Sequence, residues 1–202
     1  MGHLKISILI FCINFNAYSK TIDLFKAKKR VYRGKYYSEK EYILESERSF
    51  LAPVGITSYE IPNINTKAYQ IDLKFKKISG TDSLGLVLPV GKKIVQVVLG
   101  GWSHKFSGIS YIDNNVLNSP ENITRSPASF DYDKDSTMRF VVDDDFVVLN
   151  VNGKTLSKLK YKEHSFGVNP NLNDYLKEKQ QDQILLWVIK GRVELTEFNL
   201  KY

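Results

Sequence analysis

Apolar and polar residues alternate along most of this chain, in short stretches separated by turn residues. Residues 68–78 (AYQIDLKFKKI) show this alternation most clearly. One face of the stretch carries Tyr69, Ile71, Leu73 and Phe75. The other face carries Gln70, Asp72, Lys74 and Lys76. A period of two residues with one apolar face predicts a β-strand that packs one side against a core.

Turn residues divide the next segments into predicted hairpins. Gly80-Thr81-Asp82-Ser83 precedes the apolar residues 84–88, and Gly91-Lys92-Lys93 precedes residues 94–99 (IVQVVL). Both connections contain the glycine and polar residues that are typical of hairpin turns.

The second half of the chain has the same organisation. Three aspartates at positions 143–145 precede residues 146–151 (FVVLNV), and Asn152-Gly153 follows them. The Asn-Gly pair favours a type I′ hairpin turn. Residues 184–189 (ILLWVI) and 193–200 (VELTEFNL) are joined by a short turn, which predicts a final antiparallel pair.

These patterns predict an all-β protein. No long stretch carries the 3.6-residue apolar period of an amphipathic helix. Residues 169–183 are polar and include Pro170, which predicts a loop with at most one helical turn. The length of 202 residues fits one domain, and the sequence shows no internal repeat or interdomain linker.

The first residues have the pattern of a secretory signal. An apolar run covers residues 6–17, and a membrane-spanning helix needs about 20 such residues. Small residues at Ala17 and Ser19 indicate cleavage after Ser19. We therefore expect a signal peptide at residues 1–19 and a single domain without a transmembrane segment at residues 20–202. The protein would be secreted or located in the periplasm or cell envelope. A buried N-terminal strand is the alternative.

The formal net charge of +7 favours contact with anionic surfaces or polyanions. Cations are densest at residues 26–40 (KAKKRVYRGKYYSEK), where tyrosines lie between them. Such a run can stack on and neutralise a polyanion, but lysines also protect exposed sheet edges. Because a secretory signal argues against contact with nucleic acid, we expect a solvated edge and no nucleic-acid partner.

Several short motifs resemble those of a bacterial family. They are Leu88-Pro89-Val90-Gly91, Leu99-Gly100-Gly101-Trp102, Ser107-Gly108-Ile109, Ile112-Asp113 and residues 118–125 (NSPENITR). Their order is similar to that in concanavalin A-like lectin/glucanase domains of planctomycete-type bacteria, near the 3-keto-disaccharide hydrolase-type domain of unknown function. The resemblance implies a jelly-roll β-sandwich of two antiparallel sheets. It also implies a saccharide ligand or substrate, although one fold hosts many functions.

The chain departs from this family in two places. Relatives often have Asp-Gly where this chain has Asp113-Asn114, and L-G-x-W where it has Leu185-Leu186-Trp187. The missing glycine beside the tryptophan predicts a narrower groove at that point.

Carboxyl pairs that could cleave a glycosidic bond are few. Such groups lie about 5 to 10 Å apart across the bond. Glu194 and Glu197 are three positions apart on a predicted strand, which predicts that they point to opposite faces. Glu45 and Glu47 share a face, but their polar neighbours predict a solvated strand end. The catalytic residues stay unknown, and any enzymatic activity is expected to be glycoside hydrolase-like.

Candidate metal ligands are also sparse. Asp131, Asp133 and Asp135 alternate as in a calcium loop, but the glycine and bidentate glutamate of an EF-hand are missing. His104 and His164 are far apart in sequence and lack zinc-site spacing. We expect a solvated loop around the aspartates, no metal site and no cofactor.

Aromatic residues beside polar groups indicate where a sugar would bind, because sugar C–H faces pack on rings while hydroxyls need directional partners. Trp102, His104 and Arg125 offer a ring, an imidazole and a guanidinium in loops between the predicted strands that end at Leu99 and begin at Thr137. We expect these three residues to bind the ligand. The alternative for Trp102 is a plug at one end of the core. Trp187 is expected in the core, although the alternation also allows a concave face.

Three functions remain open from the sequence. A secreted, non-catalytic glycan-binding module explains the fold, the export signal and the aromatic residues, and its partner would be a polysaccharide. A glycoside hydrolase-like enzyme fits the neighbouring family. A structural or protein-interaction domain of the cell envelope is the third.

The first prediction concerns Cys12, which is the chain's one cysteine and lies inside the signal segment. We expect the exported protein to lack residues 1–19 and to fold under reducing conditions, because the mature chain then has no thiol to oxidise. Intact-mass analysis of the exported protein checks this. A mass that includes residues 1–19 would contradict the signal-peptide interpretation.

Overall fold

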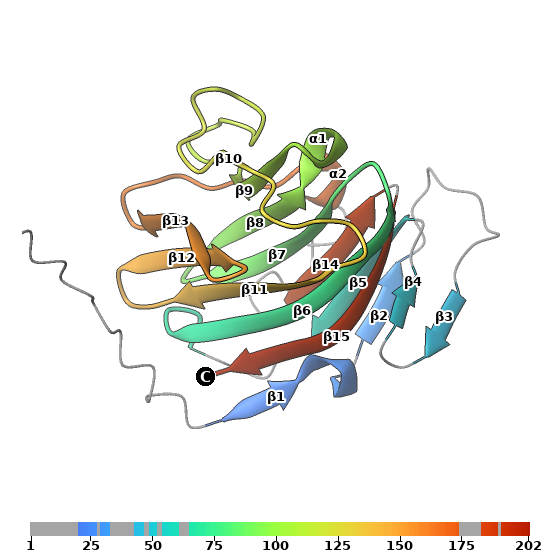
Figure 1. Cartoon of the computed structure of the whole chain (residues 1–202). Coiled ribbons are helices and arrows are strands. Elements are labelled where there is room, and N and C mark those ends of the chain that lie inside the picture. The colour runs from blue at the N-terminus through green and yellow to red at the C-terminus, as the bar shows by residue number, and fades with distance from the viewer. Residues whose placement is uncertain are drawn as a thin grey trace, which may run out of the picture.

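Two antiparallel β-sheets make up most of the protein (Figure 1). The structure is a computed structural model and describes residues 20–27, 29–32, 43–46, 49–51, 54–60, 65–173, 183–189 and 191–202. The predicted signal peptide at residues 1–19 lies outside these ranges, as do most of the basic run at residues 26–40 and Glu47, and the side chain of Glu45 is not described. No helix within the described ranges is long and apolar enough to cross a bilayer.

The first sheet has six strands, in the spatial order β1 (Thr21–Asp23), β15 (Gly191–Lys201), β6 (Tyr69–Gly80), β11 (Asp135–Val142), β12 (Phe146–Val151) and β13 (Lys154–Lys160). The second has seven, in the order β10 (Ser126–Pro127), β9 (Phe106–Ser110), β8 (Lys93–Gly100), β7 (Leu84–Val90), β14 (Gln183–Ile189), β5 (Val54–Glu60) and β2 (Lys29–Tyr32). A separate pair consists of β3 (Ile43–Ser46) and β4 (Ser49–Leu51).

Short helical turns complete the described elements. They are η1 (Leu24–Lys26), α1 (Gly101–His104) and α2 (Pro170–Asn173). The last of these is the helical turn that the sequence allowed within residues 169–183. The predicted all-β sandwich of two antiparallel sheets is therefore confirmed.

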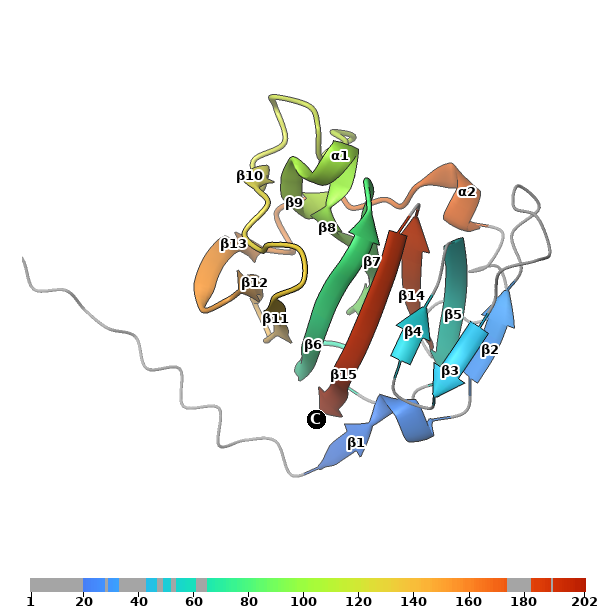
Figure 2. The same cartoon turned by 45° about the vertical axis from the view of Figure 1, so that its right-hand side comes forward.

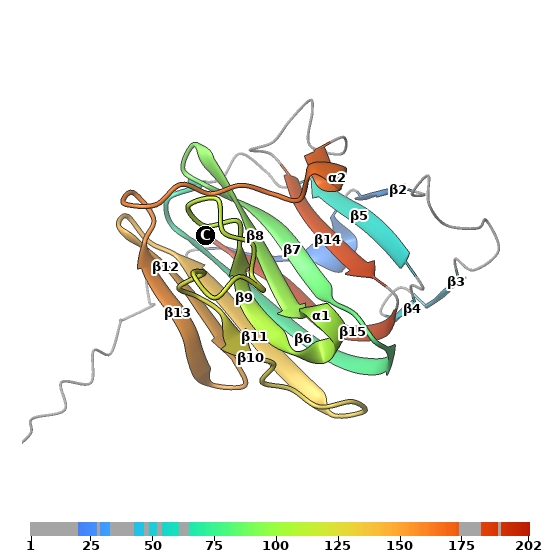
Figure 3. The same cartoon turned by 90° about the horizontal axis from the view of Figure 1, so that it is seen from above.

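The main core lies between the two sheets, which face each other as layers (Figure 2, Figure 3). From β6 this core receives Tyr69 (0% exposed), Ile71 (0%), Leu73 (2%) and Phe75 (1%). Lys74 and Asp72 alternate with them and lie on the outer face of the first sheet, where they line a surface hollow. The predicted face of residues 68–78 is confirmed.

Two predicted hairpin turns have the backbone that their residues favour. Asn152 and Gly153 have φ values of 49° and 77°, and a type I′ turn requires two positive values. Gly91, with φ of 58°, begins the turn that joins β7 to β8. At the aspartate turn, the Asp143 carboxylate accepts hydrogen bonds from the Asp145 and Phe146 amides at 2.9 and 2.6 Å.

Two other predicted hairpins are wrong. The turn after Gly80 carries the chain from β6 in the first sheet to β7 in the second, and β14 and β15 likewise lie in different sheets. A glycine-containing polar turn can form either a hairpin within one sheet or an arch between two sheets. The strands that pair with the two flanking strands decide which of the two forms. β14 buries both of its faces and pairs with β7 and β5 on its two sides, which places it inside the second sheet.

The prediction for Glu194 and Glu197 is also wrong. Glu194 lies opposite Lys76 and Glu197 lies opposite Lys74, both on the outer face of the first sheet. A β-bulge between Leu195 and Glu197 adds one residue to β15 and shifts the alternation. The two glutamates therefore share a face.

A smaller apolar cluster lies on the outer face of the second sheet. It contains Val87, Val98, Leu117, Leu172, Leu185 and Trp187. Residues from the segments after β9 and in α2 thus cover a sheet whose central strands are apolar on both sides. Trp187 is buried, as predicted, but in this outer cluster and not in the main core.

The strand register generates the second prediction. Leu73→Ala should lower the free energy of unfolding by about 2 to 5 kcal/mol because it leaves a cavity in the main core. Lys74→Ala, on the outer face of the same strand, should change it by about 0.5 kcal/mol or less. Urea unfolding of both variants measures the difference. Equal effects at the two positions would show that the register is wrong.

Candidate functional site

A left-handed turn at the end of β8 presents Trp102. The turn, α1, holds Trp102, Ser103 and His104 at φ values of 53°, 60° and 63°. Left-handed backbone costs an ordinary residue about 1 to 2 kcal/mol. Three consecutive residues persist in it because surrounding contacts hold them there, and such strain concentrates at functional sites.

His104 supplies the main contact that holds this turn. Its Nε2 lies 2.8 Å from the Phe130 carbonyl oxygen, and since a carbonyl only accepts, Nε2 donates. The imidazole ring lies 4.6 Å from the Phe130 ring and 4.8 Å from the Tyr132 ring, centroid to centroid. His104 therefore ties the turn to the segment that carries Phe130 and Tyr132.

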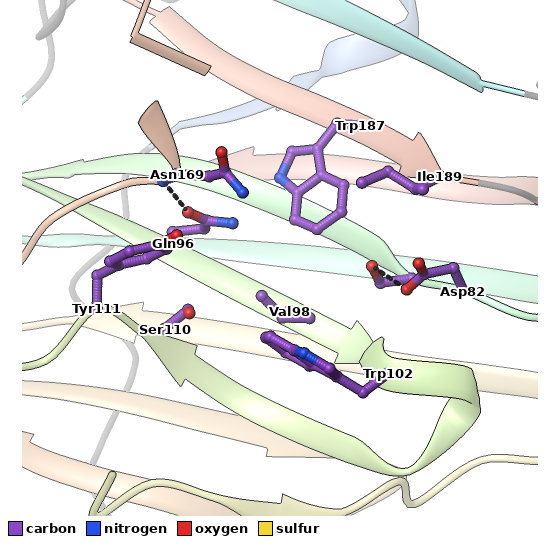
Figure 4. Close-up of a pocket in the computed structure, with 10 residues that line it drawn as sticks. Asp82, Gln96, Val98, Trp102, Ser110, Tyr111, Asn169, Trp187 and Ile189 are labelled. Carbon is purple, nitrogen blue, oxygen red and sulfur yellow. Dashed lines mark hydrogen bonds between the residues drawn. The ribbon is translucent and has the colours of Figure 1, made fainter. Parts of the chain in front are cut away.

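A hollow of about 180 Å³ opens beside Trp102, over the outer face of the second sheet. We call it the groove (Figure 4). Its lining consists of Asp82, Ser83, Gln96, Val98, Trp102, Ser110, Tyr111, Asn169, Trp187 and Ile189. These residues come from β8, α1, β14, the turn before β7, the end of β9 with the residue after it, and the segment before α2. Trp102 is 38% exposed, whereas Trp187 is 4% exposed and forms part of the floor.

Gly85 provides the space for the Trp187 ring. The two residues lie opposite each other on β7 and β14. A Cβ atom at Gly85 would lie 2.1 Å from Trp187 Cζ2, a distance that no side chain tolerates. Trp187 Nε1 is buried and has no hydrogen-bond partner within the described residues.

The groove lining also contains polar side chains that are held by hydrogen bonds. Gln96 is 3% exposed, and its side-chain oxygen accepts a hydrogen bond from the backbone N–H of Asn169 at 2.7 Å (Figure 4). This contact orients the Gln96 side-chain NH₂ group. The Asp82 carboxylate accepts a hydrogen bond from the Ser83 hydroxyl at 3.1 Å. The groove therefore combines aromatic surface with oriented donors and acceptors.

Lys77 fixes the wall of the groove that carries Asp82. It is 1% exposed and donates a hydrogen bond to the Asp82 carbonyl oxygen. Burial lowers the pKa of Lys77, and the negative charge of Asp82 partly opposes this. The Lys77 ammonium lies 5.1 Å from the centroid of the Tyr132 ring, and the Tyr132 hydroxyl donates to the Gly80 carbonyl at 2.7 Å. Tyr132 thus joins the wall at Asp82 to the turn of Trp102.

The three residues predicted to bind ligand have different positions. Trp102 lines the groove, and His104 lies outside the lining and binds the Phe130 carbonyl. Arg125 lies outside the lining, with its guanidinium 4.3 Å from the centroid of the Phe106 ring at the start of β9. Sequence reasoning did not select Gln96, Ser110 or Asn169, because nothing local distinguishes these polar residues from others on strands and loops.

Charge within the groove is low. Asp82 is the one charged residue among the described lining residues. Hydrolysis by paired carboxylates needs two acids, and the described lining residues provide one. No group of three His, Cys, Asp or Glu side chains within the described ranges is placed to hold a metal. Asp131, from the candidate calcium loop, pairs with Lys134 at 2.9 Å.

Comparisons with known proteins identify the fold class. No protein-family profile matches the chain, and no curated protein matches it in sequence. The Crh5 transglycosylase in complex with NAG is similar in structure, with a TM-score of 0.53, 10% identity, and coverage of 90% of this chain and 83% of that chain. A protein of unknown function with a galectin-like fold from Bacillus subtilis has a TM-score of 0.51, 9% identity, and coverage of 92% and 96%.

These likenesses concern the fold alone, because the identities are low. The chain has a galectin-like, concanavalin A-like jelly-roll β-sandwich. The predicted fold class is thereby confirmed.

The contact of Trp187 with Gly85 generates the third prediction. Gly85→Ala should displace the Trp187 ring and lower the free energy of unfolding by about 1 to 3 kcal/mol, as overpacking does. In a Trp102→Phe background, the fluorescence of Trp187 alone should shift to the red. Gly167→Ala is the matched control, because its Cβ would make an ordinary contact of 3.4 Å with Tyr111. Unchanged stability and emission in the Gly85 variant would contradict the packing described.

Proposed function

We propose that this chain is a glycan-binding module and that the groove beside Trp102 holds a saccharide unit of a polysaccharide. One observation carries this proposal. A half-buried tryptophan on a strained turn faces a hollow that has a second tryptophan in its floor and oriented amide groups in its walls.

Each part of the groove has a role in this proposal. The Trp102 and Trp187 rings offer apolar surface to the C–H face of a sugar. The side chains of Gln96 and Asp82 offer a donor and an acceptor to its hydroxyls. The complex of a similarly folded transglycosylase with NAG supports a saccharide as the ligand.

The other two predicted site residues lie outside the groove lining. His104 positions the turn of Trp102 through its bond to the Phe130 carbonyl. Arg125, held on the Phe106 ring, would contact a ligand that extends beyond the groove. We also propose export of the mature domain at residues 20–202, and kinship with the planctomycete-type domains near the 3-keto-disaccharide hydrolase group, on the motifs given above.

Glycoside hydrolase-like activity is the second candidate. It is favoured by the transglycosylase likeness and by the presence of the Asp82 carboxylate in the groove. Asp82→Asn separates the two functions, because it removes an acid but keeps the size of the side chain. Loss of turnover with retained binding would support the enzyme.

The fourth prediction tests the glycan site. Trp102→Ala should abolish retention on the polysaccharides that bind the wild type, while stability falls by about 1 kcal/mol or less, as is usual for surface positions. A large aromatic residue in the core would instead cost about 3 to 5 kcal/mol. Affinity electrophoresis and thermal melting give the two measurements.

Ile123→Ala is the control for this test. Ile123 is 62% exposed and lies outside the groove lining, so its loss should leave retention unchanged. Wild-type protein that binds no polysaccharide in a broad panel would reject the glycan site and favour the protein-interaction alternative.

A further inference from the structure

A second hollow lies on the outer face of the first sheet. It has a volume of about 550 Å³ and crosses the four adjacent strands β15, β6, β11 and β12. Polar side chains dominate its lining, and no aromatic residue occurs among the described residues that form it. This face is on the opposite side of the sandwich from the groove, because the groove lies over the outer face of the other sheet.

One carboxylate organises the floor of this hollow. The Asp72 side chain is 16% exposed. Its oxygens accept hydrogen bonds from Gln70 Nε2 at 2.6 Å, Arg139 Nε at 2.7 Å and Lys201 Nζ at 2.6 Å. Burial alone would raise the pKa of Asp72, but hydrogen bonds from Lys201, Arg139 and Gln70 outweigh this and hold it below its ordinary value.

The cations outnumber the carboxylates in the lining. The lining contains three cations, Lys74, Arg139 and Lys201, and two carboxylates, Asp72 and Glu197. It therefore carries one positive charge in excess. Lys74 is also 3.9 Å from Asp135, but both side chains are well exposed, so this pair is weak. The Arg139 side chain is 50% exposed, so donors of its guanidinium remain open to solvent after the bond to Asp72.

We propose that this hollow binds the carboxylate or sulfate group of an acidic polysaccharide. Asp72 holds two cations in place before the ligand arrives, which reduces the ordering cost of binding. A guanidinium presents paired N–H donors that match a carboxylate or sulfate. Without an aromatic platform among the described lining residues, attraction of charge rather than stacking on a ring supplies the affinity. The excess charge of the hollow has the same sign as the net charge of +7 of the whole chain.

The test uses full-length mature protein and three probes in about 0.1 M salt, where screening leaves contacts within about 10 Å effective. The probes are polygalacturonate, dextran sulfate and unsubstituted dextran. The wild type should bind one or both of the charged probes and bind dextran far more weakly through this face. Preference for polygalacturonate or for dextran sulfate distinguishes a carboxylate from a sulfate ligand.

Matched variants separate a site from general charge. Arg139→Gln should weaken binding of the charged probe at least about tenfold, as loss of a hydrogen bond to a charged group does. Arg192→Gln removes the same charge from an exposed position of β15 outside the hollow and should have little effect. Lys201→Gln and the exposed turn variant Lys92→Gln form a second pair, which decides the result if Arg139→Gln melts at a much lower temperature.

Two results would overturn the proposal. Equal weakening within each pair would show unspecific attraction by net charge. Loss of charged-probe binding in Trp102→Ala would place that ligand in the groove instead. Because the glycan proposal predicts loss in Trp102→Ala and none in Arg139→Gln, the failure of either proposal is visible without the other.

Discussion

The second sheet must be covered on both faces, and the rest of the structure depends on this constraint. Its central strands β7 and β14 bury side chains in the main core and also on the outer face. Apolar surface left in water costs about 25 cal/mol per Å², so the chain places Leu117 and Leu172 over the outer face. The groove lies where this cover ends, with Trp187 at its floor. A ligand with an apolar face would cover more of the outer face of the second sheet.

Rigid connections hold the walls of the groove. The turn of Trp102 and the turn of Asp82 lie at the ends of different strands, yet His104, Tyr132 and Lys77 connect them by ring packing and hydrogen bonds. A preformed site loses less conformational entropy when it binds. These contacts hold the backbone of Trp102 in its left-handed conformation, which is less stable for an ordinary residue. The aromatic side chain is therefore presented before a ligand is bound.

Local patterns predicted the parts of the fold that local physics determines. The alternation at residues 68–78 and the Asn152-Gly153 turn have the faces and φ values expected from short-range sterics and burial. The sheet to which β14 and β15 belong depends on distant partners, and an arch and a hairpin use the same turn residues. The bulge before Glu197 inserts one residue without a sequence signal, so the shared face of Glu194 and Glu197 could not be predicted.

The site was predictable to a similar extent. Trp102 could be selected because an aromatic residue with polar neighbours followed a predicted strand. Gly85, in contrast, acquires its role through cross-strand pairing with Trp187, and Gln96 acquires its role through a hydrogen bond with Asn169, which is distant in sequence.

The most direct test of the glycan site is a ¹H–¹⁵N spectrum, in which the chain's two tryptophans give two indole signals. On titration with neutral oligosaccharides of a bound polysaccharide, both indole signals should shift together and saturate, while the amides of Arg139 and Lys201 stay unchanged. Indole signals that stay in place while other regions shift would contradict the account.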